Sequence, residues 1–497
     1  MLKPLHDIGA ITARQQDGVE VLMQTENAEI CRRLRSHLGK SHDMAQVVQR
    51  IKKVAARFAD WCKLIQSIES TLDIRECLVT LKGSADAVAA AAAAAAAIDG
   101  GMRDGNSGHQ GFFARLLDGI DPIVLRCCLE GLSDVIDPSA TMEDREVVIR
   151  SGYDDELDEK KCLLADLPDI LRAVGKLVLQ ENPVLDELSV EYVPQIGFLT
   201  ALNKQFSHLA PSSFSFAFAQ QGDTVYFKNP KMHEVDDDIG DIQAKITDRQ
   251  AAIMRALEEA LLEQEMSLHA AAAATAELDA AMSLASVASD FGFVRPEVVE
   301  DNVIIIKNGR HPLQARPEEA PRWRHRELTV ERFIPNDTYI ADGSRVALIT
   351  GANCSGKSVY LKQVGVAVFL AHVGSFVPAE RAIIGLTDRI FTRIATVETS
   401  ALPQSSFTID VAHMVRSGTP RSLLLIDEFG KGTAPPDGIG LVAALLRHLS
   451  RTGCKCLLTL HFHEIFSEGL VKIHGPDEMR TELPDVSVFR MDVHVPT

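Results

Sequence analysis

The stretch RVALIT at residues 345–350 continues as GANCSGKS at residues 351–358 and then as VYLKQVGVAVFLAHV at residues 359–373. An apolar strand pattern is followed by an octet of the form G-x-x-x-x-G-K-[ST] and by a helical pattern. The glycines of the octet let backbone amides curve around a phosphate, and the helix N-terminus adds partial positive charge. In such a loop Lys357 reaches the β and γ phosphates and Ser358 ligates Mg²⁺. The octet therefore predicts a phosphate-binding loop.

Three further apolar runs lie around this octet. They are VIIIK at residues 303–307, SLLLID at 422–427 and CLLTL at 456–460. Each run is short and rich in branched apolar residues, and helical patterns separate the runs. Strands of this kind are typical of a parallel sheet that is covered on both faces. Together with RVALIT, the runs predict an α/β domain built on one parallel sheet.

Acidic residues stand at the end of the second run, where Asp427 is followed by Glu428. Because all strands of a parallel sheet end on the same side, we expect these carboxylates beside the phosphate loop. There Asp427 can hold Mg²⁺ through water, and Glu428 can orient or deprotonate an attacking water. The alternative is a strand that merely ends in solvated acids.

His461 directly follows the run CLLTL, so the same rule places it near the rim of the γ-phosphate. We interpret it as a γ-phosphate sensor, with an ordinary strand-end histidine as the alternative. A zinc-protease HExxH motif is excluded, because the position that would need histidine is Ser467. His463 is interpreted as an ordinary histidine.

The rest of the chain is mainly helical. Residues 45–74 carry apolar side chains every three or four positions, which predicts one long amphipathic helix. Between about residues 160 and 231, apolar and polar residues alternate with glycine and proline punctuation, which predicts a small antiparallel sheet. The helical pattern returns at Val235 and continues to about Ser289.

These changes of pattern predict four consecutive parts. We expect the first helical part at residues 1–159, an inserted sheet-bearing module at 160–231 and the return of the helical part at 232–290. The α/β domain with the phosphate-binding loop should follow at 291–497.

Composition limits the class of protein. With 497 residues the chain is long enough for several domains, and its 46% hydrophobic residues supply sizeable cores. The net charge of −18 excludes a generally basic nucleic-acid coat, although a local basic surface remains compatible with it. Nine cysteines without CxxC pairs favour a reducing compartment. We expect no membrane span and no signal peptide.

Several motifs in fixed order resemble one family. They are NGRHPL at 308–313, the octet with its helix, HVGSFVPAE at 372–380, SSFTIDVAHM at 405–414, LLLIDEFGKGT at 423–433 and TLHFHEIF at 459–466. This series is similar to the ATPase domain of the MutS family, and the helical part with its insertion is similar to that family's middle domains. The strings KSVYLKQVG, DEFGKGT and YVPQIGF resemble the meiotic branch.

The resemblance implies a multidomain fold: an all-α lever with an inserted small β/α clamp, followed by an α/β P-loop ATPase domain of the ABC type. It implies that ATP and Mg²⁺ are bound, with Ser358 and Asp427 as the metal ligands. The positions that match the family's nucleotide-binding and catalytic residues are Gly351, Asn353, Gly356, Lys357, Ser358, Asp427, Glu428, His461 and, acting in trans on the partner's site, Ser405.

The function implied by the resemblance is that of a DNA-dependent ATPase. It would form half of a heterodimeric sliding clamp with a second MutS homologue, on branched junctions and duplex DNA in meiotic recombination, in the nucleus on chromosomes. The alternatives are a non-hydrolysing nucleotide-binding scaffold and a mismatch-repair MutS homologue. A transporter-like or chromosome-structural ATPase would carry an LSGG-type signature, whereas this chain has SSFT at 405–408.

The chain also departs from the family pattern. Ala352 and Ser355 replace the usual proline and second glycine of the phosphate loop. No Phe-x-Glu occurs in the first hundred residues, so we expect the mismatch-reading wedge to be absent. The chain stops soon after VSVFRMDVHV, so we expect the ATPase domain to lack its C-terminal end.

Overall fold

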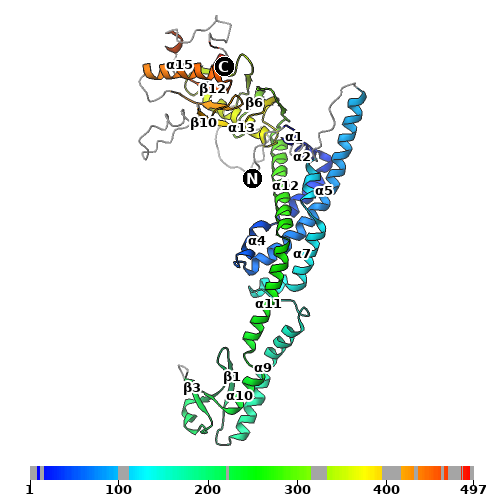
Figure 1. Ribbon diagram of the computed structural model, residues 1–497, viewed down its shortest axis with the longest axis vertical. Coiled ribbons are helices and arrows are strands. Elements are labelled where there is room, and N and C mark those ends of the chain that lie inside the picture. Colours follow the sequence, from blue (N-terminus) through cyan, green and yellow to red (C-terminus); the bar gives the residue numbers. More distant parts are fainter. Residues whose placement is uncertain are drawn as a thin grey trace. The chain divides into compact units, whose positions relative to one another are not determined.

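Strands around the octet form a five-stranded parallel sheet in a computed structural model of the chain (Figure 1). In spatial order they are β10 (Ile390–Arg393), β11 (Leu423–Ile426), β12 (Lys455–Thr459), β8 (Val346–Gly351) and β13 (Val486–Met491). The runs RVALIT, SLLLID and CLLTL supply β8, β11 and β12. The parallel sheet predicted from these three runs is confirmed.

The structure describes residues 8–11, 16–98, 111–219, 223–314, 333–394, 416–429, 435–460, 464–467, 483 and 485–492. Their contacts divide the chain into two units. The first comprises Met1–Gly39, Asp73–Ile120 and Ala273–Thr497, and the second comprises Lys40–Leu72 and Asp121–Ala272. The four-part division expected from the sequence stays a prediction.

Helices cover both faces of the parallel sheet. Successive residues of each strand point to opposite faces, so the strands contribute to two separate cores. The core with α15 (Pro435–Thr452) includes Leu348, Leu424 and Leu458, and the core with α13 (Lys357–His372) includes Ile349, Leu425 and Leu457. Burial on both sides explains why these strands are continuous apolar runs in the sequence.

A second sheet lies in the same unit and has four strands. Their order is β5 (Glu297–Val299), β9 (Arg381–Gly385), β6 (Ile304–Gly309) and β7 (Asn336–Ile340). The run VIIIK forms most of β6, which pairs antiparallel with both β7 and β9. Its expected place in the parallel sheet is therefore wrong. Ile304 and Ile306 are buried whereas Lys307 is exposed, so this strand is covered on one face only.

Helices make up most of the remaining described chain. Those of the first unit are α1 (Ile8–Ile11), α2 (Asp17–Met23), the 3₁₀ helix η2 (Thr25–Asn27), α3 (Ala28–Leu38), α6 (Phe112–Asp118) and α16 (Glu464–Ser467). Those of the second are α4 (Met44–Lys52), α7 (Pro122–Val135), α8 (Pro138–Asp144), α9 (Asp155–Glu181), α10 (Pro230–Asp238) and α11 (Ile242–Glu263). Two long helices, α5 (Phe58–Ile98) and α12 (Glu265–Phe291), contribute residues to both units.

The single helix expected over residues 45–74 is wrong, because α4 ends at Lys52 and α5 begins at Phe58. Between them Val54 has a φ of 53° and is exposed. The buried Asp60 carboxylate accepts hydrogen bonds from the Arg57 backbone N–H at 3.0 Å and from the Arg50 side chain at 2.7 Å. These hydrogen bonds fix the turn between the two helices. The spacing of apolar residues in the sequence is not interrupted at this turn, so it gave no sign of the break.

The small antiparallel sheet predicted from the alternating segment is confirmed. Its strands, in spatial order, are β1 (Ser189–Val193), β2 (Gly197–Asn203), β4 (Thr224–Lys228) and β3 (Ser215–Ala219), with the 3₁₀ helix η3 (Lys204–Leu209) after β2. The first third of the segment is helical, because α9 continues to Glu181. No helix in the described part of the chain is long and apolar enough to cross a membrane.

Candidate nucleotide-binding site

The octet forms a tight loop between the end of β8 and the first residue of α13. Gly351, Cys354 and Gly356 have positive φ angles of 151°, 62° and 93°. At Gly351 a side chain is also excluded by space, since a Cβ would lie 2.5 Å from the Met491 carbonyl oxygen. At Gly356, the N-cap of α13, nothing lies within 4 Å of a Cβ position. A curved loop that opens a helix presents backbone N–H groups to an anion.

Lys357 lies inside the curve of this loop. It is the first residue of α13 and is buried. Its Nζ donates hydrogen bonds to the carbonyl oxygens of Gly351 and Ala352, both at 2.8 Å. The loop thus holds an ammonium group beside its own N–H groups, which is the charge that a bound phosphate requires.

The acidic pair after β11 is held in place by β12. Thr459, the last residue of β12, is fully buried, and its hydroxyl donates to Asp427 Oδ1 at 2.6 Å. The same hydroxyl oxygen accepts a bond from the Glu428 backbone N–H at 2.8 Å. Glu428 has a φ of 50°, so the chain turns at this residue. One threonine therefore fixes the positions of both acidic residues.

Strand register brings the loop and the acidic pair to one edge of the sheet. Leu458 of β12 pairs with Ile426 of β11 on one side and with Leu348 of β8 on the other. The next link is a backbone hydrogen bond of 3.0 Å from Leu460 to Ile349. Because β12 alone separates β11 from β8, the strand ends are about 10 Å apart, or two interstrand spacings. This span fits a phosphate group and a metal ion between the loop and the carboxylates.

A cavity of about 160 Å³ adjoins the loop. It is lined by residues of β7, β8 and β13 and by Tyr360 of α13. The cavity lies next to the loop because Met491, which lines the cavity, pairs with Gly351 at the start of the loop. The Tyr360 hydroxyl donates to Thr338 Oγ1 at 3.0 Å, and burial raises the pKa of this phenol. The Tyr360 side chain is therefore neutral at physiological pH.

The structure thus brings together the predicted loop residues and the two acids. Ser358 lies in the first turn of α13, half-buried, and Asn353 is exposed in the loop. Asp427 has one carboxylate oxygen bonded to Thr459, so its other oxygen can serve a metal ion, and a serine hydroxyl with one carboxylate is a donor set that Mg²⁺ accepts together with phosphate and water. Ser405 and His461 lie outside the described residues.

Thr459 is the functional candidate that the sequence did not single out. It is the only polar residue in the run CLLTL, and it ends the strand next to the acidic pair in space. A polar residue in a fully buried strand requires a hydrogen-bonding partner, so the position of Thr459 in the sequence already indicated that its side chain bonds to a neighbouring group.

Two protein-family models match this chain, one in its first part and one in its last part. The family model for MutS domain III matches residues 1–285, and the model for MutS domain V matches residues 347–475. The first covers more than half of the chain. The second contains β11, β12, α13, the acidic pair and nearly all of the octet's strand β8.

Curated relatives agree with these models. MutS protein homolog 5 of Saccharomyces cerevisiae is 30% identical over 91% of this chain and 50% of its own length, and that of Caenorhabditis elegans is 27% identical over 93% and 32%. The DNA mismatch repair protein MutS of Ruminiclostridium cellulolyticum is 31% identical over 68% of this chain and 38% of its own length. The chain therefore spans half or less of the length of these relatives. With two MutS domain models matched in order and relatives from yeast, worm and bacteria, the chain belongs to the MutS family.

Proposed function

We propose that the chain is an ATP-hydrolysing, DNA-binding protein of the MutS type. The observation that carries this proposal is the pairing of the buried Lys357 in its loop with the acidic pair anchored by Thr459 at the same sheet edge. Phosphoryl transfer needs a cation at the phosphates, a carboxylate for the metal and a group that positions the nucleophile. The described residues supply all three.

Within this site each side chain has one role. The backbone N–H groups from Gly351 to Gly356, including that of Asn353, hold the phosphates of ATP, and Lys357 neutralises their charge. Ser358 and Asp427 hold Mg²⁺, which supplies further positive charge at the phosphates. Glu428 orients the attacking water and accepts its proton. The cavity beside Met491 and Tyr360 receives the uncharged part of the nucleotide.

Two further residues complete the site in this proposal. In the sequence His461 comes two residues after Thr459, the last residue of β12, which holds the acidic pair. There it senses the γ-phosphate. Ser405 belongs to the signature segment and acts on the nucleotide of a partner chain.

The cellular role proposed here is that of the meiotic branch. The chain would be half of a heterodimeric sliding clamp with a second MutS homologue and would stabilise branched recombination intermediates in the nucleus. ATP would close the composite sites, the lever helices would transmit that closure, and the clamps would meet around DNA. The relative from Ruminiclostridium cellulolyticum is a DNA mismatch repair protein, which supports a DNA substrate.

Single-turnover hydrolysis of ATP tests this function. The chain is measured alone, with branched DNA, and with DNA and the partner homologue together. We expect bound ATP to be hydrolysed and the rate to rise with DNA and partner. Binding without hydrolysis under all three conditions would instead identify the non-hydrolysing scaffold.

A variant of Ser405 tests the heterodimer. In a heterodimer whose partner retains its own phosphate-loop lysine, Ser405→Ala should slow hydrolysis at the partner's site and leave ATP binding at this chain's loop intact. With the partner's lysine replaced, only this chain's site turns over, and the variant should then have little effect. Loss confined to this chain's own site contradicts the role in trans.

A further inference from the structure

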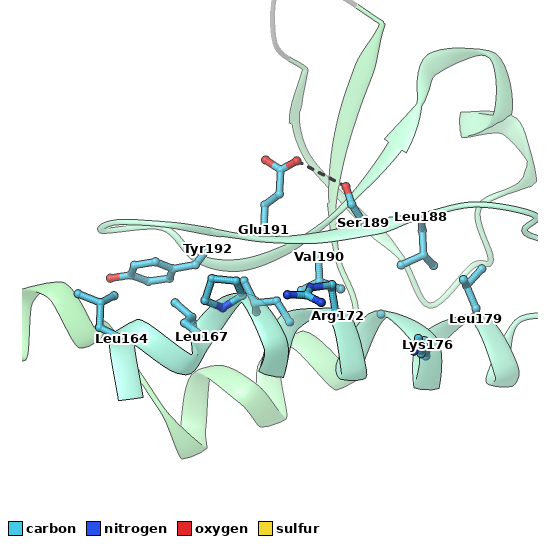
Figure 2. A pocket seen from close by; sticks show the side chains of 13 residues that line it. Leu164, Leu167, Arg172, Lys176, Leu179, Leu188, Ser189, Val190, Glu191 and Tyr192 are labelled. Atoms are coloured by element: carbon cyan, nitrogen blue, oxygen red, sulfur yellow. Dashed lines mark hydrogen bonds between the residues drawn. The ribbon is translucent and has the colours of Figure 1, made fainter. Parts of the chain in front are cut away.

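A groove of about 670 Å³ lies in the second unit between helix α9 and strand β1 (Figure 2). One side of the groove is a stripe of leucines spaced by one helical turn on α9. The stripe consists of Leu164, Leu167, Leu171 and, two turns later, Leu179. Apolar side chains at this spacing share one face of a helix. This side, the floor of the groove, is therefore largely apolar.

The other side of the groove is strand β1. Leu188 and Val190 lie on the side of the strand that faces α9, whereas Ser189 and Glu191 lie on the opposite side, where the serine hydroxyl is bonded to the carboxylate (Figure 2). The Tyr226 hydroxyl also donates to Glu191, at 3.0 Å. The Glu191 charge is thus engaged within the sheet and does not point into the groove.

Strand β1 has an open edge beside this floor. It is the outer strand of the four-stranded sheet, and among the described residues only β2 pairs with it. The outer edge of such a strand presents unpaired N–H and C=O groups, which can accept another strand. An apolar floor beside an open strand edge is the arrangement by which extended peptides are bound as an added strand.

The rim of the groove is basic. Arg172 and Lys176 are exposed one helical turn apart on α9, and both line the groove. Arg172 forms an ion pair with Asp169 of the same helix, which is equally exposed, and such surface pairs contribute little. Lys176 has no ion-pair partner among the described residues. Charge complementarity therefore favours an acidic ligand.

We propose that this groove binds an extended segment of a partner protein in which apolar residues alternate with acidic ones. The main chain of that segment pairs with the open edge of β1, and its apolar side chains pack on the leucine stripe. Its acidic side chains reach Arg172 and Lys176. A helical ligand would use the leucine stripe but leave the strand edge unpaired, so we commit to the extended form. The proposal does not depend on the nucleotide site.

A selection of displayed peptides tests the proposal. The probe is a library of random nine-residue peptides on phage, selected on the full chain and then synthesised with a fluorescent label for polarisation measurements. We expect the enriched peptides to alternate apolar and acidic residues. In the double variant Arg172→Glu/Lys176→Glu their affinity should fall at least about tenfold, since each lost charge contact contributes on the order of 1 kcal/mol.

A matched variant controls for the change in charge. Arg126 and Arg255 are exposed residues of the same unit that do not line the groove, so Arg126→Glu/Arg255→Glu has the same charge and should bind the peptides like the parent. Unchanged ATP binding and helical circular dichroism establish that both variants are folded. Enrichment of no peptide, of basic peptides or of peptides with apolar residues at helical spacing overturns the proposal, as does equal loss in both double variants.

Discussion

Single side chains at the candidate site are held by hydrogen bonds within the protein. Lys357 is held by two carbonyl groups of its own loop, and the hydroxyl of Thr459 joins the acidic pair to the neighbouring strand. Groups fixed in this way lose little freedom when a ligand arrives, so their interactions with charge are strong. The proposed roles of Lys357, Glu428 and Thr459 can be tested separately, because Lys357 would act on the phosphates, Glu428 on the attacking water and Thr459 on the positions of the two acids.

Lys357→Ala should weaken ATP binding. The ammonium is the one cation inside the loop among the described residues, and its loss leaves phosphate charge uncompensated. We expect the dissociation constant measured by calorimetry to rise at least about tenfold, which corresponds to about 1.4 kcal/mol. Lys362→Ala is the matched control, since this exposed lysine lies on the same helix. Equal affinity in the parent and Lys357→Ala would remove the phosphate-loop assignment.

Glu428→Ala should separate binding from turnover. The carboxylate proposed to activate water is lost while the loop remains, so ATP should bind as in the parent. Turnover in single-turnover assays should fall by a factor of about a hundred or more, the usual contribution of a general base. A parent-like rate would show that another residue is the base.

Thr459→Val should slow turnover through the acidic pair. Valine keeps the shape of threonine but cannot donate to Asp427 or accept from Glu428. We expect turnover to fall about tenfold with ATP affinity little changed, because each bond contributes on the order of 1 kcal/mol to the positioning of the acids. Thr459→Ser restores the hydroxyl and should restore most of the rate. Failure of serine to rescue would mean that packing, not the hydroxyl, is what matters.

At the scale of elements, β12 has a polar residue near each end. Thr459 ends it beside the acidic pair, and Lys455 begins it at the opposite edge of the sheet. Lys455 is fully buried, and its Nζ donates to Asn302 Oδ1 and, at 3.2 Å, to the Arg421 carbonyl oxygen. Burial lowers the pKa of this lysine from 10.5 to about 8. The strand therefore makes the stability of the domain dependent on pH.

Between pH 8 and 10.5 the free energy of unfolding of the parent should rise with pH, and that of Lys455→Met should lack this rise. Between pH 8 and 10.5 the unfolded chain keeps the lysine proton that the folded chain has lost, so raising the pH favours the folded state. The difference in unfolding free energy, parent minus variant, should increase by about 3 kcal/mol over this window. Urea unfolding at several pH values measures it. A difference that is constant with pH would show that Lys455 does not titrate in this range.

At the scale of the whole molecule, charge is distributed unevenly. The chain carries a net charge of −18, and acidic residues outnumber lysines between residues 186 and 241, the part that contains the small sheet. By contrast, α3 carries Arg32, Arg33 and Arg35. The proposed attraction to DNA would therefore have to come from local groups of basic side chains rather than from the overall field.

DNA binding should accordingly be steeply dependent on salt and indifferent to a single mismatch. Contacts from lysine and arginine to phosphates release counterions but read no bases, so affinity should fall as salt rises for matched and mismatched duplexes alike. Fluorescence polarisation with both duplexes at several salt concentrations measures this. A clear preference for the mismatched duplex would support the mismatch-repair alternative.

The sequence alone determined the strand-loop-helix at residues 345–373, the place of Asp427 and Glu428 at a strand end, and the small sheet of β1 to β4. These features depend on local order: glycines at fixed spacing, apolar runs and alternation along one strand. The parallel arrangement of β8, β11 and β12 followed as well, because a strand buried on both faces leaves a continuous apolar run in the sequence.

Tertiary structure alone decided which strand pairs with which. The run VIIIK predicts a strand but not the sheet to which the strand belongs. Only its long-range pairing with β7 and β9 assigns it to the second sheet. The break between α4 and α5 depends in part on the Arg50 side chain of one helix meeting Asp60 of the next in the folded chain. The run CLLTL indicates that Thr459 needs a hydrogen-bonding partner, but only register identifies that partner as Asp427. The periodicity of a sequence indicates which residues are buried, but it does not indicate which residues they contact. Those contacts are made between distant parts of the chain and are decided only in the folded structure.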